Sequence, residues 1–538
     1  MKHRSAKSFL GGSILLVVLL VLAAALPISA QSDEKVIRVG MWSSPGNMSP
    51  INADSSYGYF IVPFVFDSLV TLEEDFSFSP RLAASWDVSE DGNTYTFHLQ
   101  PDAVWHDGTP LTSADVLFTI ETVADPDVQT NRGSTLRAIE GLDSNGKMVG
   151  DDIPGVSVID DLTIAVTTKT PVDPARFLEQ FGFSLYIIPK HLLEGLDAEE
   201  LVRTPVLLSP EVGSGPFRFV RYETDQFIEM EKNPDYFLEP AKVDRVFVRI
   251  VGAASLAAQL IREEIDVTAG PGIGEIPLQD VEIVENAPNV RIVTEPALGY
   301  QFMGINNLQP YFGDARVRQA LAYGTNRQLM VDQLYRGEAV LAKGPFSPVT
   351  PYENEDIDYI PYDPDHARAL LEEAGWDFGQ TVEILVPTGN RQREQSGSII
   401  QANLQAIGMQ VRLQQLDFPT VLSRVFADEY DLVLLGWTDT FDPDHLSSTF
   451  MTGGQYNLTN FSHPRVDELI EEAGAERDPD IRKELYDEIQ VLMQEYVPAV
   501  FMYYPNMLAA ANVRLVNADP SIVRFENRAV EWDILEAE

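Results

Sequence analysis

The sequence predicts a mixed α/β protein, and three observations support this fold class. Short runs of alternating apolar and polar residues, which are typical of strands, occur at 36–39, 94–99, 156–166 and 217–222. Helix-forming stretches that begin at capping residues lie between these runs. Residues 380–440 follow the order strand, helix, strand, helix, strand, which is the pattern of a layered α/β lobe.

One helix start follows directly from the side chain of Thr112. Its hydroxyl is placed to accept a hydrogen bond from the free amides of a helix that runs through 116–123. Asp115 stands three positions further on and completes a capping box. We therefore expect a well-formed helix after Thr112.

Two further helices are predicted in the second half of the chain. Asp363 followed by Pro364 is typical of a helix start, and Gly375 is placed to end this helix. Another helix is expected over 397–407, and the alternating residues 409–413 after it predict a strand.

Residues 1–30 have the layout of a secretory signal peptide. Basic residues precede an apolar run over 9–26, and the small residue Ala30 permits cleavage after it. The apolar run is also long enough to span a bilayer, so an uncleaved N-terminal anchor is the alternative. After Ala30 no apolar stretch reaches spanning length, and we expect an exported, soluble body.

Composition excludes several classes of function. The 538 residues contain no cysteine, which rules out disulfide bonds, thiolate metal sites, a cysteine nucleophile and a lipid attached to cysteine. The 82 acidic residues outnumber 38 basic ones, and the formal net charge is −44. Such a charge repels nucleic acid and anionic lipid, so neither is expected as a partner.

The short motifs of common catalytic sites are missing. The chain has no GxxxxGKS/T loop, no GxSxG elbow and no HExxH pair, and the glycines of 270–274 predict a turn. His445 beside Asp442 and Asp444 is typical of a turn and not of a metal site. The acidic run 353–358 is expected to be a solvated face. We therefore predict no catalytic residue, no metal and no cofactor, and a protein that is not an enzyme.

Segments spread over nearly the whole chain resemble one known family. In chain order they are Phe66 to Val70, Pro80 to Trp86, Asp91 to Leu99, Trp105 to Thr112, Gly213 to Phe217, Asn233 to Phe237, Asp314 to Tyr323 and Tyr430 to Trp437. This ordered set resembles the family 5 solute-binding proteins of ABC importers for dipeptides, oligopeptides and nickel complexes. Most of these residues have structural roles, such as the turn at Asp107 and Gly108 and the cap at Thr112.

The resemblance implies a periplasmic-binding-protein-like fold of class II (cluster C), with two gripping lobes and an extra inserted lobe. Lobe I would comprise 31–66, 212–297 and 507–538. The inserted lobe II would comprise 67–211, and the second gripping lobe, lobe III, would comprise 298–506. A ligand would lie in the cleft between lobes I and III, which close by a hinge motion.

The resemblance also implies a function. The protein would be a monomer in the periplasm or at the outer face of the cytoplasmic membrane, and it would capture a small peptide. It would deliver this peptide to permease subunits that work with a separate ATPase. An oligosaccharide ligand is the alternative within the family, because Trp437 and nearby amide side chains suit a sugar. A secreted hydrolase and a sensor of the same fold are the further alternatives.

The segment after the Gly-Trp pair contains the predicted ligand anchor. Peptide-binding members hold the ligand's amine with an aspartate a few residues after this pair, which makes Asp439 the candidate and Asp442 the reserve. Capping of a turn is the other interpretation of Asp439. The neighbours that we expect in the ligand site are Trp437, Thr438 and Thr440.

The other end of the ligand has weaker candidates. Dipeptide-type members carry an arginine where this chain has Val386 and Pro387. Arg391 and Arg393 lie just beyond this position, and their guanidinium groups suit a ligand carboxylate. Solvated side chains are nevertheless the favoured interpretation of both. The stretch that pairs with ligand backbone in the family corresponds to Asp54, Ser55, Ser56 and Tyr57. Tyr300 and Phe302 lie just past a predicted lobe crossing.

Overall fold

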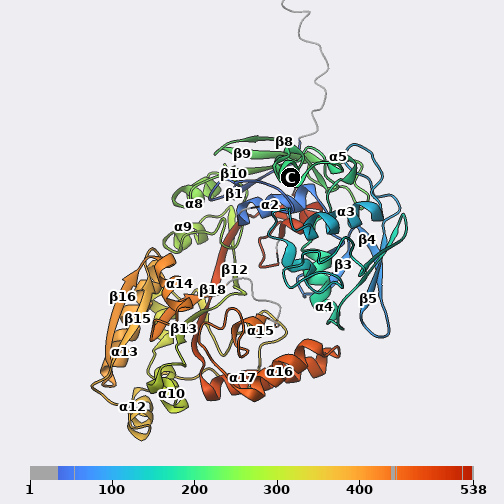
Figure 1. Ribbon diagram of the computed structural model, residues 1–538. Coiled ribbons are helices and arrows are strands. Elements are labelled where there is room, and N and C mark those ends of the chain that lie inside the picture. The colour runs from blue at the N-terminus through green and yellow to red at the C-terminus, as the bar shows by residue number, and fades with distance from the viewer. Residues whose placement is uncertain (1–33, 54, 438–442, 444, 524, 536–538) are drawn as a thin grey trace, which may run out of the picture.

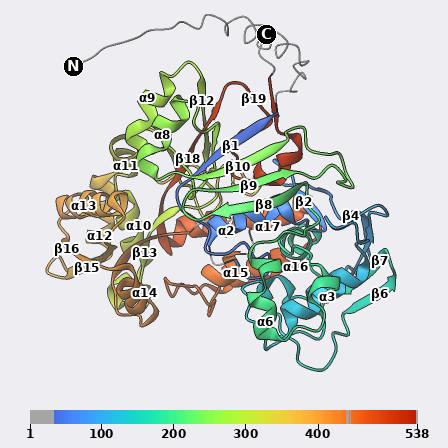
Figure 2. The same ribbon diagram turned by 90° about the horizontal axis from the view of Figure 1, so that it is seen from above.

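The computed structural model describes residues 34–535 apart from 54, 438–442, 444 and 524. In Figure 1 the segments of lobe I lie at the top, those of lobe II at the right, and those of lobe III below. Figure 2, the view from above, shows lobe II at the lower right and the larger part of lobe III at the left, with residues 445–496 of lobe III between them.

Lobe I is a twisted sheet with helices against it. Its strands are β1 (Val36–Met41), β8 (Phe217–Glu223), β9 (Phe227–Lys232), β10 (Arg245–Ile250), β11 (Val267–Thr268) and β12 (Val290–Pro296), with β19 (Leu515–Val516) and β20 (Asp533–Ile534) as a separate pair. Its helices are α2 (Ser56–Val65), α8 (Ala253–Ile261) and α9 (Val281–Glu285). β1 is parallel to β10 and β11, whereas β8, β9 and β10 are antiparallel neighbours.

Lobe II is built on an antiparallel sheet. Its strands are β2 (Val70–Leu72), β3 (Phe78–Pro80), β4 (Ala83–Val88), β5 (Thr94–Leu99), β6 (Val156–Asp160) and β7 (Thr163–Thr167). Its helices are α3 (Ser113–Ala124), α4 (Pro174–Phe177), α5 (Lys190–Leu193), α6 (Ala198–Arg203) and α7 (Pro205–Leu208). The last four strands form one sheet in the order β4-β5-β7-β6, and β2 pairs with β3.

Lobe III has a mixed sheet with helices around it. Its strands are β13 (Gln301–Ile305), β14 (Ala339–Leu341), β15 (Thr381–Pro387), β16 (Gln410–Leu416) and β17 (Leu432–Gly436). Its helices are α10 (Ala315–Tyr323), α11 (Arg327–Leu334), α12 (Pro364–Glu373), α13 (Arg391–Ala406), α14 (Phe418–Phe426), α15 (His445–Thr449), α16 (Pro464–Ala475) and α17 (Pro479–Tyr496). β15 runs parallel to both β16 and β17.

One long strand, β18 (Ala499–Asn512), joins lobe I to lobe III. Its first part pairs with β13 of lobe III, and its last part pairs with β12 and β11 of lobe I. The sheet therefore continues through both lobes in the order β16-β15-β17-β13-β18-β11-β1-β10-β9-β8. Figure 1 shows β18 running from the lobe I sheet into lobe III. The chain crosses between lobes at this strand and after β12.

The apolar cores show which lobes are packed against each other. Lobes I and II share a continuous core, in which Phe64 of α2 packs against the ring of Trp532 and close to Phe217 of β8. Lobe III has two cores of its own on opposite faces of its sheet, and adjacent residues of β17, Leu434 and Leu435, point into different ones. Parallel strands buried on both faces account for the continuous apolar run of β17.

Most elements expected from the sequence are confirmed. Thr112 caps α3 in a capping box with Asp115, and Asp363 caps α12 by accepting a hydrogen bond from the His366 amide at 2.9 Å. The order β15, α13, β16, α14, β17 is the predicted alternation over 380–440.

Two expected boundaries are wrong. The run 156–166 is not one strand but the hairpin of β6 and β7, because the chain turns at Asp161 and Leu162. The helix expected to begin at 397 begins at Arg391, because Asn390 caps it by accepting a hydrogen bond from the Arg393 amide at 3.0 Å. Among the helices that the structure describes, none combines the length and apolar character required to cross a membrane.

Candidate functional site

A cavity of about 730 Å³ lies between lobes I and III. Lobe I contributes Trp42, Ser56, Glu275 and Gln279 to its wall, and lobe III contributes Gln301, Tyr335, Glu338 and Trp437. The lining therefore combines aromatic rings with amide and carboxylate groups. This composition suits a ligand that has both apolar surface and hydrogen-bonding groups.

The two lobe crossings form part of the cavity wall. Leu298 and Gly299 line it on one crossing, and Pro505 and Asn506 line it on the other. The Ala297 amide donates to the Pro505 carbonyl at 2.9 Å, so the crossings are bonded to each other. A ligand in this cavity touches both lobes and both connecting segments, which is the arrangement required if binding is to bias a hinge.

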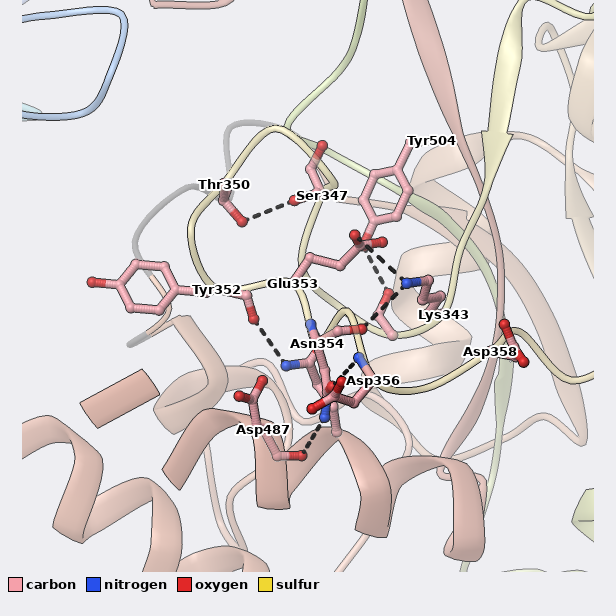
Figure 3. Close-up of polar contacts among 12 residues, drawn as sticks. Lys343, Ser347, Thr350, Tyr352, Glu353, Asn354, Asp356, Asp358, Asp487 and Tyr504 are labelled. Carbon is pink, nitrogen blue, oxygen red and sulfur yellow. Dashed lines mark hydrogen bonds and ion pairs between the residues drawn. The ribbon is translucent and has the colours of Figure 1, made fainter. Parts of the chain in front are cut away.

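Figure 3 shows the loop of lobe III that supports one crossing. Ser347 of this loop donates from its hydroxyl to the Ala297 carbonyl at 2.8 Å, and Tyr504 of β18 donates to the Gly344 carbonyl at 2.7 Å. Glu353 lies 3.8 Å from the Lys343 amine and is half-buried, and this burial raises the pKa of Glu353. The expectation that the whole run 353–358 is solvated is therefore wrong at its first two positions, since Asn354 is buried as well.

Arg393 is not a solvated side chain, in contrast to the expectation. Its Nε donates to Gln301 Oε1 at 2.8 Å, and burial beside Tyr335 and Tyr503 lowers the pKa of the guanidinium. Arg393 thereby holds Gln301, which lines the cavity. Arg391, by contrast, is exposed at the first position of α13, as expected.

Gly436 leaves room for this arrangement. A Cβ atom at Gly436 would lie 2.3 Å from Gln301 Nε2 and 2.8 Å from Arg393 Nη2. Both distances are shorter than ordinary Cβ contacts, so a side chain at position 436 would displace the ends of the Gln301 and Arg393 side chains. Gly436 permits the contact of Gln301 with Arg393, and Trp437 then reaches the cavity.

Tyr300 and Phe302 do not line the cavity, although both were expected in the site. They are 0% and 2% exposed and belong to one of the lobe III cores. Neighbouring residues of a strand point to opposite faces, and it is Gln301, between them, that faces the cavity. Phe302 instead supports Trp437, since the two rings are stacked with centroids 6.4 Å apart.

Ser55, Ser56 and Tyr57 lie at the start of α2 and not on a strand edge. Ser55 caps the helix by accepting a hydrogen bond from the Gly58 amide at 3.3 Å. Ser56 lines the cavity, and Tyr57 packs partly against the shared core of lobes I and II. Residues in a first helical turn offer free amide N–H groups to a ligand, so the pairing of this stretch with ligand backbone stays a prediction.

Some predicted site residues lie outside the described residues: Asp54, Thr438, Asp439, Thr440, Asp442 and Asp444. His445 is the first residue of α15. Within the part of the chain that the structure describes, no group of three or more His, Asp or Glu side chains is placed to hold a metal ion.

Sequence reasoning missed most polar residues of the cavity, among them Glu275, Gln301 and Glu338. Glu275 follows the turn formed by the glycines of 270–274, which was interpreted only as a turn. Burial in the cleft wall raises the pKa of Glu275. The signal that could have found it is a carboxylate directly after a glycine turn at the end of a lobe I strand, where ligands of layered α/β folds commonly bind.

Comparison with known proteins agrees with this geometry. The dipeptide-binding protein of Escherichia coli K12 is 27% identical over 527 residues, which cover 94% of this chain and 97% of the relative. The oligopeptide-binding protein AppA of Bacillus subtilis is 26% identical over 489 residues, with 87% and 86% covered. The solved structure of the ABC transporter substrate-binding protein CtaP of Listeria monocytogenes superposes with a TM-score of 0.80 at 27% identity, and covers 94% of this chain and 100% of its own.

The family model of the bacterial extracellular solute-binding proteins, family 5 Middle, matches residues 77–457. This match covers more than half of the chain and includes most of lobes II and III. The three-part arrangement and the interlobe cavity described above are consistent with it. The chain belongs to the family 5 bacterial extracellular solute-binding proteins.

Proposed function

We propose that this protein is exported, binds short peptides between lobes I and III, and delivers them to the permease of an ABC importer. The observation that carries the proposal is the cavity of about 730 Å³ bounded by both lobes and both crossings. Its volume falls within the usual range of small-molecule sites, about 300–1,000 Å³. Relatives of similar length are named for dipeptides and oligopeptides, which favours a peptide ligand.

The same proposal assigns roles to the parts of the chain. Residues 1–30 act as the export signal or as an anchor, and the three lobes have the ranges that the family resemblance implies. Lobes I and II, which share a core, move as one body against lobe III. The protein works as a monomer without catalysis, and a separate ATPase drives transport through the partner permease.

Peptide binding is tested by isothermal titration of the purified protein with trialanine, dialanine and tetra-alanine, and with maltotriose as the sugar alternative. Trp42 and Trp437 line the cavity, so their fluorescence gives a second readout. Saturable one-to-one binding of at least one peptide is expected. Binding of the sugar and of no peptide would replace the proposal with an oligosaccharide-binding function, and slow loss of intact peptide would indicate a hydrolase.

A further inference from the structure

Two carboxylates face the cleft from opposite lobes. Glu275 comes from lobe I, in the segment after β11, and Glu338 comes from lobe III, directly before β14. Both are half-buried, and both line the cavity. They are not among the residues that the family resemblance assigned to the site.

Both carboxylates are held by the same strand, β18. Glu275 Oε1 accepts a hydrogen bond from the Leu508 amide at 3.4 Å, and Glu338 Oε2 accepts one from Asn506 Nδ2 at 3.0 Å. Asn506 and Leu508 are two positions apart, which corresponds to about 7 Å along a strand. The two carboxylates are thus fixed beside one connecting segment, one on each side of the boundary between the lobes.

Among the residues that the structure describes, the lining offers no matching positive charge. Among the described residues that line the cavity there is no lysine, arginine or histidine. Arg393 is outside the lining, and its Nε donates to Gln301, which is part of the lining. From the described residues Glu275 accepts two long hydrogen bonds, one from the Leu508 amide at 3.4 Å and one from the Gly272 amide at 3.3 Å.

A carboxylate that is partly removed from water and lacks a cation costs free energy. The raised pKa of Glu275, which burial causes, is the expected consequence of this deficit. A ligand that brings a positive charge removes the deficit, whereas a ligand that brings a negative charge increases it.

We propose that Glu275 and Glu338 form a receptor for a basic side chain of the ligand, so that the protein selects peptides containing lysine or arginine. The inference rests on the proposed peptide-binding function and adds the class of peptide to it. Because one carboxylate belongs to each lobe, a cation bound between them bridges the lobes and favours the closed cleft. Binding of the basic side chain then both selects the peptide and closes the cleft between lobes I and III.

The test compares matched tripeptides on the full mature chain. Lysine is placed at each of the three positions of trialanine in turn, and norleucine and glutamate are placed at the same positions. Norleucine has the apolar stem of lysine without its charge, so the comparison isolates the ammonium group. At one position or more, we expect the lysine peptide to bind at least about tenfold more tightly than the norleucine peptide, and the glutamate peptide to bind more weakly than both.

Glu275→Gln and Glu338→Gln keep the shape of each side chain and remove its charge. Each variant should reduce the preference for lysine over norleucine by about tenfold, while the affinity for the norleucine peptide changes little. Glu373→Gln is the matched control, because Glu373 is exposed on α12 outside the cavity. Melting curves of all three variants establish that they are folded.

The outcomes distinguish a failure of the basic-side-chain receptor from a failure of peptide binding itself. If lysine and norleucine peptides bind equally, or if both cleft variants retain the full preference, the basic-side-chain receptor is wrong and peptide binding stands. If acetylation of the N-terminus abolishes binding of every peptide and the two variants weaken all of them equally, the pair holds the terminal amine, and the selection for side chains is overturned. If no peptide binds at all, the proposed function itself fails.

Discussion

Arg482 of α17 forms a buried ion pair with Asp173, the residue that caps α4 of lobe II. Arg482 Nη1 lies 3.1 Å from Asp173 Oδ1, and the two side chains are only 3% and 9% exposed. Arg482 also donates to the Tyr352 hydroxyl at 3.1 Å, on the loop of Figure 3. A second arginine of lobe III, Arg477, donates to the Asp91 carbonyl of lobe II. Lobe II is therefore fastened to lobe III beside the cleft.

This ion pair should resist opening of the cleft. Loss of one partner of a buried pair costs about 3–5 kcal/mol, because the other charge stays buried without compensation. The loss of the pair with Asp173 falls only on the state in which lobes II and III touch, whereas the hydrogen bonds of Arg482 to Tyr352 and Ala473 within lobe III are lost in both states. Arg482→Met and Asp173→Asn should each favour the open state, and small-angle scattering without ligand should give a larger radius of gyration than for the wild type. Asn still caps α4, so the fold is kept.

Two further variants check this interpretation. Arg203→Met removes an exposed pair on α6, where both partners are 74% exposed, and should leave the radius of gyration unchanged. The double variant Arg482→Met with Asp173→Leu removes both buried charges and should recover part of the closed population. Identical scattering for all of these proteins would show that the pair has no influence on opening.

His106 should make stability depend on pH. Its Nδ1 accepts from the Gly213 amide at 3.1 Å, so the neutral ring donates from Nε2 to the Gly215 carbonyl at 2.9 Å. Burial lowers the pKa of His106 from 6.5 to about 4. The unfolded chain therefore binds a proton more readily than the folded one. The stabilisation is complete above about pH 6.5 and is lost as the pH falls toward 4, by roughly 3 kcal/mol in total.

Urea unfolding at several pH values measures this effect. Many carboxylates titrate in the same range, so the informative quantity is the difference in the free energy of unfolding between wild type and His106→Gln. Glutamine keeps a hydrogen-bond donor for the Gly215 carbonyl. The variant should lose less stability than the wild type between pH 6.5 and 4. Parallel curves for the two proteins would contradict the assignment.

The elements that sequence predicted well are those whose signals are local. The cap at Thr112 and the cap and proline at Asp363 and Pro364 act within one helical turn, so neighbouring residues are sufficient to identify them. The start of α13 was missed because its first residues are polar and exposed, and Asn390 is a cap without an apolar pattern after it. The hairpin of β6 and β7 was missed because alternation continues through its tight turn.

The cleft could be predicted only in part, because its two walls come from distant segments. Trp437 was found through the resemblance, whereas Glu275 and Glu338 carry no local pattern and gain their role only when β18 brings the lobes together. Arg393 was misjudged because exposure depends on Tyr335 and Tyr503, which sequence spacing does not place beside it. Successive side chains of β13 point to opposite faces of the sheet, so Gln301 faces the cavity and its neighbours Tyr300 and Phe302 face the core.

Gly436→Ala should damage the ligand site without unfolding the protein. The added Cβ would overlap the ends of the Gln301 and Arg393 side chains, so one or both must shift from the positions in which they are bonded. We expect peptide affinity to fall by about tenfold or more, while the melting temperature changes by only a few degrees. Gly453→Ala is a control for the glycine change itself, since nothing lies within 4 Å of its Cβ position, although its positive φ of 76° adds local strain.

Asp439→Asn tests the amine anchor that the family resemblance implies. Asp439 lies outside the described residues, so its role stays a prediction from the sequence. If its carboxylate holds the terminal amine of a peptide, its neutralisation should cost about 2–5 kcal/mol of binding, which is roughly one to three or more orders of magnitude in affinity. N-acetylation of the peptide should cause a similar loss in the wild type and little additional loss in the variant, because both changes remove the same interaction. A residue that only caps a turn would instead lower the melting temperature and leave the response to acetylation intact.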